Sequence, residues 1–468
     1  MGETQPRVAV IGGGVSGLVA ALRLRQRLGP HAVIDVFEAS SSPGGLLASQ
    51  LVDGLLLDSG AESFIVRRPE AVALIDELGL IDHVVTPTTR RPAVLAGGRL
   101  HPLPRPTLMG VPADVSAVTD LIDPVDRDRM LAEATRGLDW SSDGDVSIGE
   151  FVADRFGRSV VDRSVDPMLS GVYSSRSDDI GLRAALPQLA ARLDAGADSL
   201  GAAVTSLLPP SSSAPVFGAL DGGYRLLVDR LVEISGARVH LDHPVGALTP
   251  AAAGWALDDV AYDAVIVALP APAAATLLSA GAPGLAAPLR RIETASSALV
   301  LLAIAPGVDL PDHSGVLVAT GEATTAKAIT LSSRKWSHLA DGPGLVRASF
   351  GRYGDPVDDT PDRALIDAAI TDLGTVVDLV GSGPGLRTGD VIDAVVQRWP
   401  VGLPRYAPGH RALVAELAVH RPSGLALCGS AYDGVGVPAC IARAGVAVGQ
   451  VVTDLAVAGG DADGTMEP

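Results

Sequence analysis

A glycine pattern near the start of the chain constrains the fold more than any other feature of the sequence. Gly12, Gly14 and Gly17 lie between the apolar run VAVI and a segment with helical spacing at residues 18–28, and residues 33–37 have the pattern of a second buried strand. In this register the first glycine permits a tight turn, the second lets the backbone contact a pyrophosphate, and the third lets helix and strand pack closely. The pattern therefore predicts a Rossmann-like turn that binds a dinucleotide.

An acidic residue closes the predicted second strand. Glu38 follows the turn by about 20 residues, where a carboxylate accepts hydrogen bonds from an adenosine ribose. Three glycines alone could form an ordinary turn, but their combination with strand, helix, strand and terminal acid favours nucleotide binding. Because a carboxylate at this position disfavours a 2′-phosphate, NAD and FAD are favoured over NADP.

Further glycine-rich segments decide between NAD and FAD. The pair Gly44-Gly45 and the loop at residues 54–65 come soon after Glu38, where NAD enzymes continue a regular strand–helix alternation. Near the C-terminus, the run LALC, a glycine-rich turn and a helix that begins near Pro438 repeat the strand–turn–helix order. The N-terminus of that helix suits an anionic reduced flavin, although an ordinary βα turn stays an alternative. Together these segments favour FAD.

The charge balance restricts the partners. The chain has 36 basic and 54 acidic residues, a net charge of −18, so we expect no nucleic-acid partner. Cys428 and Cys440 show neither metal-ligand spacing nor a disulfide framework, which predicts no metal site and fits a reducing cytoplasm. Prolines and glycines interrupt the apolar run at residues 264–289. We therefore expect no transmembrane segment, and a peripheral membrane contact stays open.

The order of the predicted elements indicates a mixed α/β and α+β chain. If both glycine-rich ends contact one cofactor, distant segments share one domain and the middle of the chain holds the substrate. Residues 296–308, 314–320, 326–333 and 344–351 have the patterns of successive strands, and residues 207–215 have the composition of a linker. We predict a discontinuous Rossmann-like FAD-binding domain (1–66, 216–290, 400–468), a mixed-sheet substrate-binding domain (67–100, 200–215, 291–399) and a helical subdomain (101–199).

Several motifs give the chain a family resemblance. DSGAESFIVRRPE, GGRLHPLP, DPMLSGVYSSRSDDIGLRAALPQL, AITLSSRKW, LVRASFGRYGD and YDGVGVPACI resemble segments of the FAD-dependent protoporphyrinogen and coproporphyrinogen oxidases of haem biosynthesis. These enzymes lie within the amine-oxidase-like flavoprotein superfamily. The glycine fingerprint is common to that superfamily, whereas the segments around Gly171 and Lys335-Trp336 are more specific. AITLSSRKW looks like the version in soluble coproporphyrinogen oxidases of actinobacteria.

The resemblance implies a set of flavin contacts. One departure is Leu46, which stands where many such flavoproteins place Arg or Lys, so a charge contact to the pyrophosphate is missing or supplied elsewhere. The protonation state of Glu62, a carboxylate close to the expected flavin position, stays open. The implied FAD contacts are Gly12, Gly14, Ser16, Gly17, Glu38, Ala39, Gly45, Gly60, Ala61, Glu62, Ser63, Val245, Trp399, Val435, Gly436 and Val437.

The resemblance also implies a reaction. It is the six-electron oxidation of a porphyrinogen to a porphyrin in three rounds, with oxygen reoxidising the flavin to give hydrogen peroxide. Because coproporphyrinogen has four carboxylates, an acidic protein needs a local positive clamp, for which Arg67 and Arg68 are the first candidates and Arg176 and Lys335 the next. Gly171 is assigned to close substrate approach. The sequence identifies no catalytic base.

Other activities stay open at this point. An amine oxidase would need Lys327 or Lys335 near the flavin and an aromatic cage, which an aromatic content of 3% disfavours. A carotenoid desaturase and a non-catalytic flavin- or tetrapyrrole-binding protein are further alternatives. The sequence does not decide between coproporphyrinogen and protoporphyrinogen, although the actinobacterial resemblance favours the first. A transient contact with the next enzyme of the haem pathway is a further expectation.

Overall fold

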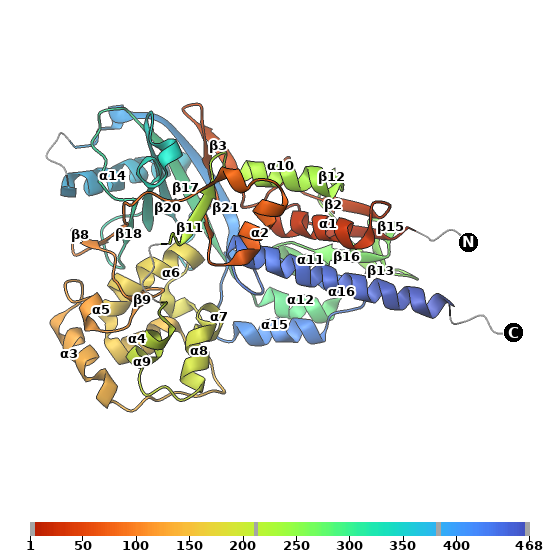
Figure 1. Cartoon of the computed structure of the whole chain (residues 1–468), viewed down its shortest axis with the longest axis horizontal. Coiled ribbons are helices and arrows are strands. Elements are labelled where there is room, and N and C mark those ends of the chain that lie inside the picture. The colour runs from red at the N-terminus through yellow and green to blue at the C-terminus, as the bar shows by residue number, and fades with distance from the viewer. Residues whose placement is uncertain (1–4, 210–213, 381–384, 464–468) are drawn as a thin grey trace.

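Two β-sheets and a group of helices build the protein (Figure 1). The computed structural model describes residues 5–209, 214–380 and 385–463. Both ends of the described chain lie beside the smaller, parallel sheet, while the larger sheet and the helical group occupy the opposite end of the molecule. The mixed α/β and α+β class predicted from the sequence is confirmed.

The smaller sheet has five strands, all parallel, in the order β12-β2-β1-β16-β22. Three distant parts of the chain supply them, which confirms the predicted discontinuous Rossmann-like arrangement. These strands are short and almost wholly apolar because both faces of the sheet are covered. Their bounds are Arg7–Ile11 (β1), Val33–Phe37 (β2), Arg238–His240 (β12), Ala264–Val267 (β16) and Leu425–Leu427 (β22).

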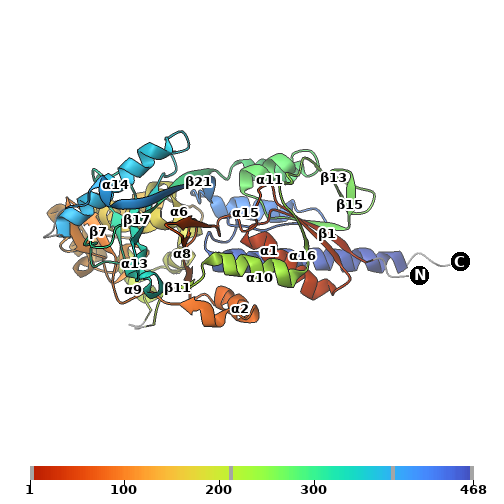
Figure 2. The same ribbon diagram turned by 90° about the horizontal axis from the view of Figure 1, so that it is seen from above.

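Helices cover both faces of the parallel sheet (Figure 2). One face packs against α1, α2, α10 and α16 in a single apolar core, and the other packs against α11, α12, α15 and a three-stranded meander. The bounds on the first face are Val15–Leu28 (α1), Pro69–Glu77 (α2), Tyr224–Ser235 (α10) and Val437–Asp463 (α16). Those on the second are Ala271–Leu277 (α11), Pro283–Arg290 (α12), His410–Val419 (α15), Leu248–Pro250 (β13), Trp255–Leu257 (β14) and Val260–Tyr262 (β15).

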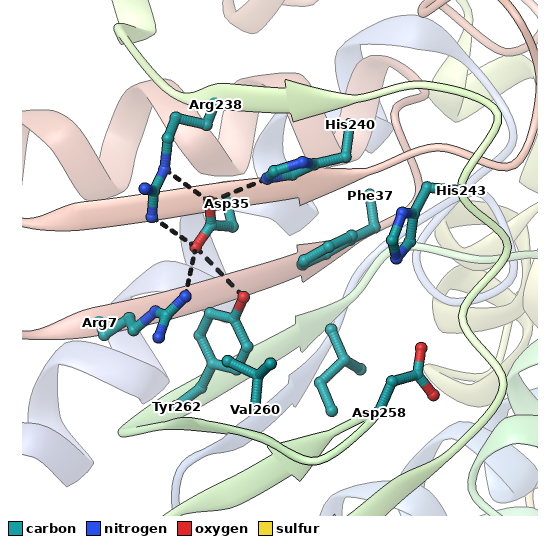
Figure 3. Close-up of a pocket in the computed structure, with 10 residues that line it drawn as sticks. Arg7, Asp35, Phe37, Arg238, His240, His243, Asp258, Val260 and Tyr262 are labelled. Carbon is teal, nitrogen blue, oxygen red and sulfur yellow. Dashed lines mark hydrogen bonds and ion pairs between the residues drawn. The ribbon is translucent and has the colours of Figure 1, made fainter.

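The edge of this sheet carries a charged cluster around Asp35 (Figure 3). Arg238 and His240 lie 2.8 Å and 3.0 Å from one Asp35 oxygen. The Tyr262 hydroxyl donates to the other at 3.2 Å, and Arg7 lies 3.5 Å from it. Burial opposes ionisation of Asp35, but its hydrogen-bonding partners outweigh burial and keep its pKa below the ordinary value. The cluster therefore ties β1, β2, β12 and β15 together.

The larger sheet has seven strands in the order β21-β17-β20-β19-β18-β7-β8. The β18–β7 pair is parallel and the others are antiparallel, as the predicted mixed sheet requires. The four strands predicted from the sequence are β17, β18, β19 and β20. The bounds are Ala93–Ala96 (β7), Arg99–Pro102 (β8), Thr294–Ile304 (β17), Gly315–Val318 (β18), Ala328–Leu331 (β19), Gly344–Phe350 (β20) and Val391–Pro404 (β21).

Period-two alternation decides what each face of the larger sheet contacts. Val346, Ala348 and Phe350 of β20 pack with helix α14 (Asp362–Val380) in one core. Leu345 points to the other face and joins Val52 in a separate cluster. Since Arg347 shares the side of Leu345, its side chain lies on the face that meets the hairpin of β3 (Ser49–Val52) and β4 (Leu55–Asp58).

The helical group has its own core, as the helix-rich pattern predicts. A short π-helical stretch, Val161–Val165, joins α5 to α6, and Arg155 and Glu133 form a buried ion pair of 2.8 Å inside the group. Helix α6 lies beside β18, between the group and the larger sheet (Figure 1). The helices are Pro124–Ala132 (α3), Ile148–Phe156 (α4), Arg158–Val160 (α5), Asp166–Tyr173 (α6), Leu182–Ala185 (α7), Pro187–Asp194 (α8) and Leu200–Leu207 (α9).

Short elements connect these parts. The hairpin β3–β4 precedes the loop at residues 58–63, which is called the flavin-side loop because the sequence predicts flavin contacts there. Strand β11 pairs with both β5 and β6, and β9 pairs with β10 at the helical group. The bounds are Ser49–Val52 (β3), Leu55–Asp58 (β4), Phe64–Ile65 (β5), Val84–Val85 (β6), Thr107–Leu108 (β9), Val111–Pro112 (β10), Phe217–Leu220 (β11) and Ser332–Lys335 (α13).

The structure differs from the predicted domain boundaries at four places, and the division as a whole stays a prediction. The boundary at 100/101 falls inside β8, which pairs with β7 as far as Pro102. Helix α2 was assigned to the substrate-binding domain, but Leu74 and Ile75 bury it in the core of the parallel sheet. Helix α9 packs with the helical group, so residue 207 ends a helix rather than starting a linker. The boundary at 399/400 falls inside β21, which pairs with β17 as far as Pro404. Residues 210–213 of the predicted linker lie outside the described residues.

One helix in the described part of the chain has the length and hydropathy of a membrane span, at residues 437–458 of α16. Its Ala444, Ala447, Val448 and Val451 are buried in the core beside α1. Only a third of the span is buried in total, and Val446 and Val457 are exposed. The buried stripe is that of an amphipathic core helix, and length with composition is weak evidence for a span.

Candidate active site

The predicted glycine turn lies at the carboxyl end of β1, where α1 begins. Gly12 has φ of +109°, and a Cβ there would come within 2.6 Å of the Ala268 carbonyl oxygen. A Cβ on Gly17 would lie 1.9 Å from the Gly12 carbonyl oxygen, so helix and turn touch at this point. The backbone therefore leaves no room for side chains at these two positions, which is the close approach that a dinucleotide turn requires.

Glu38 lies next to this turn. One of its carboxylate oxygens accepts from the Gly13 amide at 2.8 Å, and the other accepts from the Ser40 amide at 2.9 Å and the Ser40 hydroxyl at 2.7 Å. These bonds orient the carboxylate at the end of β2, beside the exposed Ala39. They leave further acceptor capacity, and binding of a ribose by Glu38 stays a prediction.

The loop at Gly44-Gly45 packs on the glycine turn at residues 12–17, and the loop at residues 58–63 packs in turn on the loop at Gly44-Gly45. The Gly44 amide donates to the Gly13 carbonyl oxygen at 2.8 Å, and a Cβ on Gly45 would lie 3.1 Å from Gly14 Cα. The Ala61 amide in turn donates to the Leu46 carbonyl oxygen at 3.0 Å. Three segments that the sequence places apart thus meet at one edge of the parallel sheet.

The start of α16 comes to the same edge. Val437, its first residue, is buried in the core that contains α1, and Cys440 accepts a hydrogen bond from the Ser16 side chain. Val435 and Gly436 precede the helix, and Val435 packs against the core of the helical group. The predicted N- and C-terminal flavin contacts therefore lie at neighbouring helix N-termini, where backbone N–H groups favour anions.

Tyr406 holds the loop before α16 and was not predicted from the sequence. Its hydroxyl accepts from the Gly434 amide and donates to the Ser430 carbonyl oxygen, both at 2.7 Å. Its ring lies 5.7 Å from that of Tyr173 in α6. A lone tyrosine after a strand has no distinguishing sequence pattern, so Tyr406 could not be identified from the sequence.

Burial raises the pKa of both cysteine thiols. The pKa of Cys440 is raised to about 11 and that of Cys428 to about 12, so neither thiol is ionised near neutral pH. Among the described residues, no three His, Cys, Asp or Glu side chains gather in a metal-binding arrangement.

Glu62 is the centre of a buried charged network. Its Oε2 lies 2.8 Å from Lys335 Nζ and 3.0 Å from Arg347 Nη1. Its Oε1 accepts from the Trp336 indole at 2.8 Å and the Ser332 hydroxyl at 3.1 Å. Burial opposes the charge, but Lys335 and Arg347 outweigh it and lower the Glu62 pKa to about 2. Glu62 is therefore ionised at neutral pH, which answers the question that the sequence left open.

Lys335 was predicted to bind a substrate carboxylate, but in the structure it pairs with the carboxylate of Glu62. Its ammonium lies over the Trp336 ring, 4.8 Å from the centroid, and is bonded to Glu62. Its charge is therefore already paired inside the protein. Arg347, which was not predicted, also donates to the Gly60 carbonyl oxygen at 2.6 Å. Its place within an apolar strand is the one sequence signal that could have identified it.

Trp399 and Asp58 complete the support of this loop. The Trp399 indole donates to the Ser59 carbonyl oxygen at 3.0 Å, and a Cβ on Gly60 would lie 3.3 Å from its ring. Asp58 accepts from the Ser49 hydroxyl at 2.7 Å and from the Tyr224 amide at 3.1 Å. Burial raises the Asp58 pKa to about 6 in spite of these bonds. The loop from Asp58 to Ser63 is thus held by the larger sheet, by β3 and by the start of α10.

The predicted substrate residues lie at separate places around this loop. Arg67 and Arg68 are exposed just before α2, and Arg68 pairs with Glu70 at 2.9 Å. Gly171 is exposed on α6, where a Cβ would lie 3.9 Å from a Leu317 methyl group of β18. The half-buried Val245, a predicted FAD contact rather than a substrate residue, lies in the loop between β12 and β13. No contact in the described residues joins the two arginines to Gly171.

Together, the glycine turn, the two loops packed on it and the second helix N-terminus define a nucleotide-binding flavoprotein of the discontinuous, two-sheet type. Residues 15–452 match the family described as flavin containing amine oxidoreductase, and the chain belongs to this family. The family resemblance predicted from the sequence motifs is confirmed, and FAD is the cofactor that the family and the site share.

The chain is similar to proteins with named activities and to a solved structure. The chain is 46% identical over 452 residues to the coproporphyrinogen III oxidase of Mycobacterium tuberculosis, covering 95% of this chain and 97% of that protein. It is 28% identical to the coproporphyrinogen III oxidase of Bacillus subtilis, covering 97% of this chain and 100% of that protein. A crystal structure from Exiguobacterium, assigned as a protoporphyrinogen oxidase, superposes with a TM-score of 0.84 and 27% identity, covering 97% of this chain and 100% of that one.

Proposed function

We propose that this protein oxidises coproporphyrinogen III to coproporphyrin III with bound FAD, as a step of haem biosynthesis. The observation that carries the proposal is the convergence of three glycine loops and the start of α16 at one sheet edge. It occurs in a chain that is 46% identical to a coproporphyrinogen III oxidase over nearly its whole length. Protoporphyrinogen IX is a second substrate to be tested.

The residues present fit FAD. The close approach of Gly12 and Gly17 leaves the backbone of the turn free to receive a pyrophosphate, and two helix N-termini supply N–H donors. Glu38 is assigned to the ribose, and the loop from Gly60 to Ser63 to the flavin. When bound, FAD would accept two electrons at a time in the form of one hydride, so loss of six electrons takes three rounds.

The chain's own contribution is positioning. The Glu62 network holds the flavin-side loop in one conformation, and Gly171 leaves room beside Leu317 for a flat macrocycle. No side chain in the described residues is assigned as a base, and solvent is the proposed acceptor of the pyrrole protons. Arg67 and Arg68 are proposed to attract substrate carboxylates at the rim. Oxygen is the proposed final acceptor, with three molecules reduced to three of hydrogen peroxide per porphyrin.

The proposed setting is the cytoplasm. A net charge of −18 supports the absence of a nucleic-acid partner and disfavours anionic membrane surfaces. A peripheral membrane contact and a transient contact with the enzyme that uses the porphyrin product are further proposals. Sedimentation of the protein with vesicles of zwitterionic lipid tests the first of these.

The test of the function is anaerobic mixing of the flavin-loaded protein with coproporphyrinogen III. Bleaching of the flavin, followed by its return and the appearance of porphyrin fluorescence on admission of air, is the expected result. Faster bleaching by coproporphyrinogen III than by protoporphyrinogen IX supports the named substrate. No bleaching by either indicates a carrier, and bleaching only by amines or polyenes indicates an amine oxidase or a desaturase.

A further inference from the structure

A group of cationic side chains gathers where α6 ends. The buried Lys327 ammonium donates to the Ser174 hydroxyl at 2.7 Å and to the Gly351 carbonyl oxygen at 2.6 Å. Ser174 is the residue that follows α6, and its carbonyl oxygen accepts from the Tyr353 amide at 2.7 Å. Arg352 stands between Gly351 and Tyr353, so the end of β20 brings its guanidinium to the same place.

The two arginines of this group are unpaired. Within the described residues, neither the half-buried Arg352 nor the exposed Arg176, two residues after Ser174, makes a side-chain hydrogen bond or an ion pair. The Nε of Arg352 is shielded from solvent and has no partner. A shielded donor on a charged group with no acceptor costs free energy unless a ligand supplies one.

The three cations also repel one another. Burial and the charge of Arg352 lower the Lys327 pKa to about 7. Burial and the charge of Arg176 lower the pKa of Arg352. Each cation in this cluster disfavours the charged form of its neighbour. In a chain with a net charge of −18, the cluster is therefore an unusual local excess of positive charge.

Nearby carboxylates offset the charge of the cluster only in part: the charges of Asp166 and Asp355 favour the charged form of Arg352, but no carboxylate in the described residues forms an ion pair with Arg352 or Arg176. Asp166 accepts from the Ser177 amide at 2.8 Å and from the Thr320 hydroxyl at 2.7 Å, and lies more than an ion-pair distance from Arg352. Asp179 pairs with Arg405 at 3.2 Å. Asp355 and Arg352 are joined by backbone hydrogen bonds in an isolated antiparallel β-bridge, and their side chains form no ion pair.

The cluster adjoins the proposed substrate contact. Gly171 lies on the last turn of α6, three residues before Ser174, and faces Leu317 of β18. Figure 1 shows α6 between the helical group and the strands of the larger sheet, and α6 contacts β18. Because Gly171 lies in the last turn of α6 and Ser174 follows that helix, an anion at the cluster would lie at the same end of α6 as Gly171.

We propose that Arg176 and Arg352, supported by Lys327, bind one side-chain carboxylate of the tetrapyrrole substrate. The inference rests on the proposed function, and it identifies the residues that bind a substrate carboxylate near Gly171. A guanidinium presents a planar pair of donors that matches a carboxylate, and the unpartnered Arg352 Nε is one such donor. Lys327 positions Arg352 through Gly351, and its own charge adds to the attraction.

The test measures binding of coproporphyrin III, the oxidised product, by fluorescence quenching, so that no turnover is needed. Arg352→Gln and Arg176→Gln are expected to weaken binding about 10- to 100-fold, the value of one or two charged hydrogen bonds. Arg352→Lys is expected to recover part of the loss. The dependence of the dissociation constant on salt is expected to become shallower in both Gln variants, a change that a structural role for these side chains does not produce.

Arg363→Gln is the matched control, because Arg363 is exposed on α14 and pairs only with Asp367. Flavin content and thermal midpoint verify that each variant is folded. Unchanged binding and salt dependence in both Gln variants, with wild-type bleaching intact, overturn this inference alone. Absence of both porphyrin binding and bleaching in the wild type overturns it together with the proposed function. Equal weakening for protoporphyrin IX identifies a carboxylate common to both porphyrins, and weakening for coproporphyrin III alone identifies an additional one.

Discussion

The Lys335 ammonium lies 2.8 Å from a Glu62 carboxylate oxygen, and this contact joins two parts of the protein. Glu62 belongs to the loop that leaves the β3–β4 hairpin toward the parallel sheet, whereas Lys335 ends α13 between two strands of the larger sheet. Arg347 binds the same carboxylate from β20. The position of the loop that contains Glu62 is therefore set by charges from α13 and from β20 of the larger sheet, which meet at one carboxylate.

Replacing Glu62 by Gln is expected to destabilise the protein strongly. The change leaves the buried Arg347 and the half-buried Lys335 without a counter-charge, and removing the partner of a buried charge costs about 3–5 kcal/mol. The free energy of unfolding in urea, with FAD added, measures the effect. Asp367→Asn removes a partner of the exposed Arg363 and is expected to cost less than about 1 kcal/mol. Equal small costs for the two changes would show that the Glu62 network is not structural.

Asp58 is expected to make stability depend on pH. Its folded pKa of about 6 exceeds its ordinary value of 3.8 because burial disfavours the charge. The folded state therefore binds the proton more tightly, and the contribution of Asp58 to stability is present below about pH 4 and lost as pH rises through 6. The difference in unfolding free energy between wild type and Asp58→Asn is expected to change by roughly 3 kcal/mol from pH 4 to pH 7. A pH-independent difference contradicts the raised pKa.

Gly17→Ala is expected to abolish flavin binding. A Cβ there would lie 1.9 Å from the Gly12 carbonyl oxygen, so α1 must move away from the turn that receives the pyrophosphate. The purified variant is expected to be colourless and to bind added FAD at least about tenfold more weakly. The control is Gly445→Ala in α16, where a Cβ meets no atom within 4 Å. A yellow Gly17→Ala protein with wild-type affinity refutes the assignment.

Gly171→Val is expected to impair turnover without impairing flavin binding. The position is exposed and a Cβ there only touches Leu317 at 3.9 Å, so the fold accommodates a side chain while the proposed substrate space does not. We expect kcat/KM for coproporphyrinogen III to fall roughly 10- to 100-fold at wild-type flavin content. Gly445→Val serves as the comparison for a valine in a helix. Full turnover by the Gly171 variant removes this residue from the substrate site.

Arg68→Ala is expected to raise KM for the tetracarboxylate more than it lowers kcat. Arg68 is exposed and pairs with Glu70, a contact worth less than about 1 kcal/mol, so the fold is expected to survive the change. Loss of a rim charge weakens attraction of an anionic substrate without altering the reacting geometry. Steady-state kinetics at two salt concentrations measure the effect, and an unchanged KM excludes Arg68 from substrate attraction.

Local patterns determined much of the fold without the structure. The spacing of Gly12, Gly14 and Gly17, the apolar runs beside it and the terminal Glu38 require only neighbouring residues to be interpreted, and the structure has the predicted strand, turn, helix and strand there. The four strands of the larger sheet and the helix-rich segment follow from periods of two and 3.6 residues in the same way. The second glycine-rich end could be assigned to the same cofactor because it repeats the first arrangement.

Only the tertiary structure decided that Glu62 is ionised and that Lys335 and Arg347 are its partners. The same holds for the cluster of Lys327, Arg176 and Arg352. Each depends on side chains far apart in the chain, and the sequence by itself does not specify which strand face meets which loop. Charges act over a few ångströms, so their pKa values and pairing follow from the packing of distant segments rather than from spacing along the chain.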